Sequence, residues 1–130
     1  MNKWTVGVCL FCGTYYSSVG TLLFFAPRFF FMRVAPIGAY NKHYMVDLGS
    51  FLLPVGLFLL LAVRYTKWST PVMRLAALGS TLHLVSHLRD GLHTSGAMVG
   101  NAFFLAVALV LIASLITGKA ALHWIVGGRS

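Results

Sequence analysis

The chain has 130 residues, of which 58% are hydrophobic and 9% are charged, and its mean hydropathy is +0.84. Soluble globular proteins carry about 25% charged residues, so this composition excludes an ordinary soluble globule and indicates an integral membrane protein. The formal net charge is +8, but the basic residues stand singly at the ends of apolar runs. That pattern is typical of topology signals and of contacts with anionic lipids, and it argues against a nucleic-acid partner.

Four segments are apolar enough to cross a bilayer, which takes about 20 residues of helix. The first, residues 4–26, has no charged side chain, and it is too long for a secretory signal and lacks a small-residue cleavage site. The other three cover residues 46–63, 72–90 and 97–117. We therefore predict an all-α integral membrane four-helix bundle, in which residues 1–130 form a single transmembrane domain with both termini on the same side.

Residues 28–40, between the first two spans, are too apolar for an ordinary loop and combine aromatic with basic side chains. Pro27 and Pro36 bound this segment, and we expect it to lie in the membrane interface. The alternative interpretation is a lid over a lateral opening.

The basic residues predict the orientation of the bundle, because cytoplasmic loops carry an excess of Lys and Arg. The side of the termini would hold six of them: Lys3, Arg64, Lys67, Arg74, Lys119 and Arg129. The opposite side would hold four: Arg28, Arg33, Lys42 and Arg89. We expect both termini in the cytoplasm, with Trp4, Trp68 and Trp124 at the same interface.

Small residues, which let membrane helices approach closely, recur at helical spacing on the spans. The stripes are Gly13, Ser17 and Gly20 on the first span, Gly49 and Gly56 on the second, and Gly96 and Gly100 at the start of the fourth. On the third span the stripe continues into polar residues: Ala76, Ser80, His83, His87 and Asp90. Since His83, His87 and Asp90 fall within roughly 60° of arc, we expect them to face the bundle interior.

Both Asp residues and four of the five His residues are expected at one end of the bundle. His43 and Asp47 are four residues apart, so they share a helix face on the same side of the membrane. The candidate site contains His43, Asp47, His83, His87, Asp90 and His93.

Three kinds of chemistry fit such a site. Imidazole and carboxylate ligands suit zinc, copper or iron. Two histidines on facing helices would ligate a haem, and a His–Asp relay would handle protons or a quinone. The structural alternative is that these residues neutralise one another or anchor helices at the water interface. Cys9 and Cys12 form a CxxC within the first span, and we interpret them as buried free thiols.

The overall plan resembles the DoxX-like group of small four-helix bacterial membrane proteins. The resemblance rests on size, four spans, the segment Asp47-Leu-Gly-Ser-Phe-Leu-Leu-Pro-Val-Gly56, and the basic turn Arg64-Tyr-Thr-Lys67. It implies a multi-pass protein of the bacterial inner membrane, and some members look like accessory subunits of membrane oxidoreductases. The His-rich third span has no counterpart there, so no catalytic residue carries over.

We therefore expect a non-catalytic accessory subunit whose partners are membrane lipids and other membrane subunits, or further copies of itself. The alternatives are a metal- or haem-binding redox protein that uses the His/Asp cluster, and a proton or small-molecule carrier.

Overall fold

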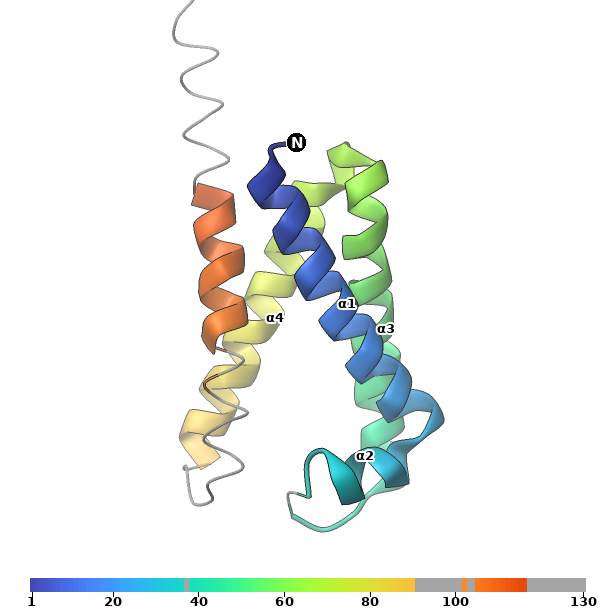
Figure 1. Ribbon diagram of the computed structural model, residues 1–130. Helices are drawn as coiled ribbons and strands as arrows, with labels where there is room; N and C mark the ends of the chain where they lie inside the picture. The colour runs from blue at the N-terminus through green and yellow to red at the C-terminus, as the bar shows by residue number, and fades with distance from the viewer. Residues whose placement is uncertain (37, 91–101, 103–104, 117–130) are drawn as a thin grey trace, which may run out of the picture.

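The computed structural model describes residues 1–36, 38–90, 102 and 105–116, and their regular elements are all helical (Figure 1). The elements are α1 (Lys3–Phe25), α2 (Pro27–Arg33), α3 (Lys42–Arg64), the short 3-10 helix η1 (Thr66–Trp68), α4 (Ser69–Asp90) and a helix over Leu105–Ile116. The all-α prediction is therefore confirmed for this part of the chain. Two of the helices, α1 and α3, are long and apolar enough to cross a membrane.

Asparagine side chains cap the two long apolar helices, α1 and α3. The Asn2 Oδ1 accepts a hydrogen bond from the backbone N–H of Thr5 at 2.7 Å, and the Asn41 Oδ1 accepts one from Tyr44 at 3.1 Å. Each cap satisfies one of the unpaired N–H groups of a first helical turn. Because Asn41 caps α3, that helix begins four residues before the predicted apolar span.

The connection between α1 and α3 contains the short helix α2, which begins at Pro27 as a proline in the first turn favours. Its exposed apolar side chains include Phe29 and Met32. Gly38 follows with a φ of 67°, a left-handed conformation that glycine adopts without strain. The predicted short segment is thus present, and its position in a membrane interface stays a prediction.

Helices α1 and α3 run antiparallel in close contact through the predicted glycine stripes. A Cβ at Gly20 would lie 2.4 Å from the backbone N of Leu53, and one at Gly56 would lie 2.3 Å from the backbone N of Ser17. Gly13 lies against Leu60 and Gly49 against Phe24 in the same register. Since both stripes face the partner backbone, only glycine allows this separation.

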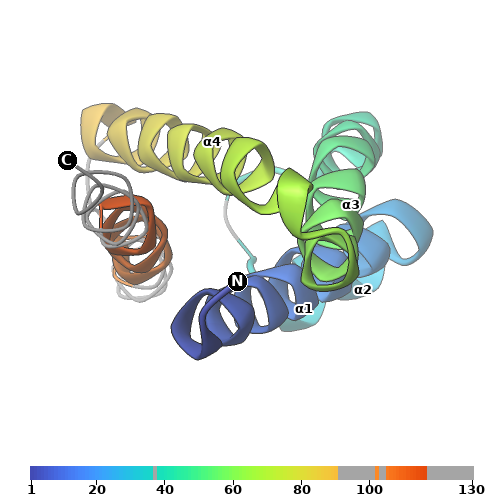
Figure 2. The same ribbon diagram turned by 90° about the horizontal axis from the view of Figure 1, so that it is seen from above.

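The long helices alternate in direction, and α4 leads away from the α1–α3 pair when the protein is seen from above (Figures 1 and 2). Near its start α4 contributes Met73 and Ala76 to the core, and Leu105–Ile116 contributes Val107 and Leu111. The second pair of helices thus meets the first half of α1, including Cys9 and Cys12.

Large apolar side chains point outward on every long helix, and many of the buried positions hold small residues. Phe25 is 72% exposed and Phe51 is 73% exposed. Only 39% of the apolar window in α1 and 22% of that in α3 are buried, whereas a core helix of a soluble protein is mostly buried. Helices with apolar surfaces facing outward suit a hydrocarbon solvent.

Candidate functional site

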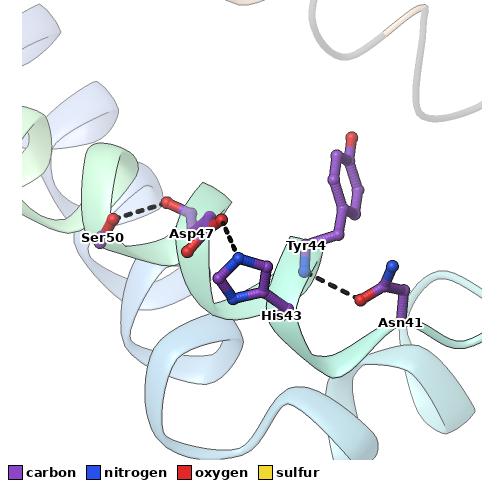
Figure 3. A network of polar contacts seen from close by, with 5 residues as sticks. All are labelled: Asn41, His43, Tyr44, Asp47 and Ser50. Carbon is purple, nitrogen blue, oxygen red and sulfur yellow. Dashed lines mark hydrogen bonds and ion pairs between the residues drawn. The ribbon is translucent and has the colours of Figure 1, made fainter.

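The first polar pair lies in the first turns of α3 (Figure 3). The His43 Nε2 is 3.3 Å from the Asp47 Oδ2, one helical turn away. The Ser50 hydroxyl donates to the Asp47 backbone carbonyl at 2.7 Å and leaves the carboxylate to His43. The two side chains are 88% and 55% exposed, so water screens their attraction and the ion pair contributes little to stability.

The second polar pair lies on α4, where His83 and His87 contact each other. Their Nε2 atoms are 3.0 Å apart, the rings meet edge to face with centroids 4.5 Å apart, and both residues are half-buried. An imidazole donates through a protonated nitrogen and accepts through an unprotonated one. The contact therefore holds one proton between the two Nε2 atoms, and it is lost if both rings are fully protonated.

The structure does not bring the two pairs into one site. Among the residues it describes, no group of three or more His, Cys, Asp or Glu side chains is placed to hold a metal ion. The physical reason is the course of α4, which leads its last turns away from the start of α3 (Figures 1 and 2). Among the described residues, His43 and Asp47 therefore do not gather with His83 and His87.

Two members of the predicted cluster are not tested by the structure. The side chain of Asp90 and the whole of His93 lie outside the described residues. Their part in a site stays a prediction.

A buried hydrogen-bonded link between α1 and α4 was not predicted as a pair. The Ser80 hydroxyl donates its one proton to the Ala76 carbonyl at 2.8 Å, so the Tyr16 hydroxyl is the donor to the Ser80 Oγ. Both side chains are buried. The place of Ser80 on the small-residue stripe signalled that it faces inward, but nothing in the sequence identifies Tyr16 as its partner.

The cysteines and the two polar pairs limit the chemistry of the described residues. Cys9 and Cys12 are free thiols and fully buried, as predicted. The His–Asp pair is a surface ion pair. The His–His pair is half-buried and places two ring nitrogen atoms next to each other. Comparisons with protein-family models, with curated proteins and with solved structures find no match. The function therefore has to be argued from these residues and surfaces.

Proposed function

We propose that the chain is a four-span protein of the bacterial inner membrane that acts as a non-catalytic subunit of a larger membrane complex. The observation that carries this proposal is the outward-facing apolar surface of the long helices. The resemblance to DoxX-like proteins, some of which look like oxidoreductase accessory subunits, agrees with this role.

The lengths of the helices support the proposed spans. At about 1.5 Å per residue, the 23 residues of α1 and of α3 extend about 35 Å, enough for a hydrocarbon core of about 30 Å. Although α4 is more polar, its Ser80 is buried while Leu78 and Leu82 are exposed. A helix can cross the membrane with such a polar side chain turned toward its neighbours.

Charged and aromatic residues support the proposed orientation. Because α1 and α3 are antiparallel, Lys3 and Trp4 at the start of α1 lie at the same end of the molecule as Arg64 (Figure 1). Lys67 and Trp68 follow directly in η1. Basic residues with interfacial tryptophans are typical of a cytoplasmic membrane surface, so we assign this end and both termini to the cytoplasm.

A groove on α1 supports the role as a subunit. It is a shallow, open depression of about 580 Å³, and its lining residues are Gly7, Leu10, Phe11, Thr14 and Tyr15. A Cβ at Gly7 would meet no atom within 4 Å, in contrast to the glycines that face α3. Small residues next to large apolar ones provide the surface on which a second membrane helix packs. We assign this groove to a transmembrane helix of the partner subunit.

Site-specific photo-crosslinking in native membranes tests the assignment. A photoreactive residue in place of Thr14 should yield a defined adduct with a larger membrane protein. The same residue in place of Leu57, which is exposed on α3, should yield none. Gly7→Leu fills the groove and should abolish the Thr14 adduct without preventing membrane insertion. Equal labelling from both positions, or a chain that remains single after mild detergent extraction, would contradict the proposal.

A further inference from the structure

We infer that His83 and His87 form a two-imidazole chelate for a divalent late first-row transition metal ion such as Zn²⁺ or Cu²⁺. The inference does not depend on the proposed subunit role. It concerns the inward face of α4 and needs neither His43 nor Asp47. It needs only two of the six residues expected from the sequence, and both lie on a single helix.

The geometry of the pair carries the inference. A transition metal binds imidazole at about 2.0–2.1 Å, which places two neighbouring ligand nitrogens roughly 2.8–3.4 Å apart for angles between about 90° and 109° at the ion. The two Nε2 atoms of the pair are 3.0 Å apart. Spacing of four residues on an α-helix holds both rings on one face, so rotation of the two side chains can turn both Nε2 lone pairs toward one ion.

The proton balance of this exchange is simple. In the free pair one neutral ring carries its proton on Nε2 and donates it to the Nε2 of the other ring. When the ion binds both Nε2 atoms, that ring takes its proton on Nδ1 instead. Both ligands are then neutral imidazoles, the form that binds metal. Binding by the neutral pair therefore requires a change of tautomer in one ring.

The same geometry decides which metal group fits. Imidazole favours late first-row ions, and affinity rises along the series to Cu²⁺. A haem with two axial histidines needs its ligands on opposite faces of the ring, whereas these two nitrogens lie side by side. Both rings are half-buried and thus partly exposed, so an ion can reach them and keep positions for other ligands. The pair can chelate an ion but cannot supply both axial ligands of one haem.

Metal titration of the full chain in mild detergent, without a polyhistidine tag and after treatment with a chelator, tests the inference. Calorimetry with ZnCl₂ should show one ion per chain. With Cu²⁺, electron paramagnetic resonance should show hyperfine coupling to imidazole nitrogen. His83→Gln and His87→Gln should each weaken binding about tenfold or more, because even the partners of metal ligands contribute about that much. His43→Gln is the matched control and should bind as the wild type does.

A rearranged variant separates the chelate from the mere presence of histidine. Val85→His combined with His87→Val keeps the composition but places the two imidazoles two residues apart, on different faces of the helix. It should lose the stoichiometric ion while its far-ultraviolet circular dichroism stays that of the wild type. The inference is overturned if the wild type binds no stoichiometric ion, if its Cu²⁺ spectrum lacks imidazole nitrogen, or if this variant binds normally.

Discussion

The packing of α1 against α3 predicts a large difference between glycines that undergo the same substitution. In Gly56→Ala the added methyl would lie 2.3 Å from the Ser17 backbone N, whereas ordinary contacts begin at 3.4 Å. The obstacle is backbone, so the two helices must separate by about 1 Å along their contact. Overpacking costs about 1–3 kcal/mol, and the better helix propensity of alanine offsets about 0.5–1 kcal/mol of this. We expect a net loss of about 1–2 kcal/mol, or roughly 5–30-fold in the folded-to-unfolded ratio.

The native thiols provide the assay for this prediction. Cys9 and Cys12 are fully buried, so a thiol-reactive fluorophore reports when α1 loses its packing on heating. The midpoint of Gly56→Ala should fall by roughly 3–10 °C. Gly7→Ala is the matched control: it lies in the interior of α1, no atom would be within 4 Å of its new methyl, and its midpoint should stay or rise slightly. Equal midpoints for Gly56→Ala and the wild type, or an equal fall in Gly7→Ala, would refute the assigned register.

Three further predictions use the same protein. Tyr16→Phe removes the donor to Ser80 and should cost about 0.6 kcal/mol, the average for hydrogen bonds between membrane helices. Ser80→Ala should lower the thiol midpoint further, because it leaves the Tyr16 hydroxyl buried without its acceptor; the reverse order would contradict the direction of the bond. Asn41→Ala removes the α3 cap, which costs about 1 kcal/mol, so the Tyr44 amide should exchange hydrogen faster while amides in the middle of α3 do not change. His43→Gln should leave the midpoint unchanged, since its ion pair is largely exposed, and a clear fall would show that the pair has a structural role.

The sequence predicted which faces of α1 and α3 pack, but not how they are aligned. Spacing identified Gly13 and Gly20 on one helix and Gly49 and Gly56 on the other, and all four face the partner helix in the structure. The register depends on how both surfaces fit at once, which no single stripe specifies. The start of α3 differed from the predicted span because hydropathy detects the apolar residues only, whereas the Asn41 cap admits a polar first turn.

The contacts of the candidate residues within one helix could be predicted from the sequence, whereas contacts between residues of different helices could not. The spacing of four residues correctly predicted that His43 shares a face with Asp47. In the structure these two side chains are in contact, and so are those of His83 and His87. Helical periodicity says nothing about the course of one helix relative to another. In the structure α4 leads its last turns away from the start of α3 (Figures 1 and 2). That is why the two pairs do not meet.

The polar residues on the inward face of α4 include the buried Ser80 and the half-buried His83–His87 pair. Measurements of stability and of metal binding distinguish a structural role from a ligand role. Ser80 is buried and joins α1 through Tyr16, so packing explains its presence. His83 and His87 contact each other within one helix. If the pair only supported the fold, His83→Gln and His87→Gln would lower the thiol midpoint together with any metal affinity. A ligand role predicts lost metal binding at an unchanged midpoint in the metal-free protein, so the two measurements on one set of variants distinguish the two roles.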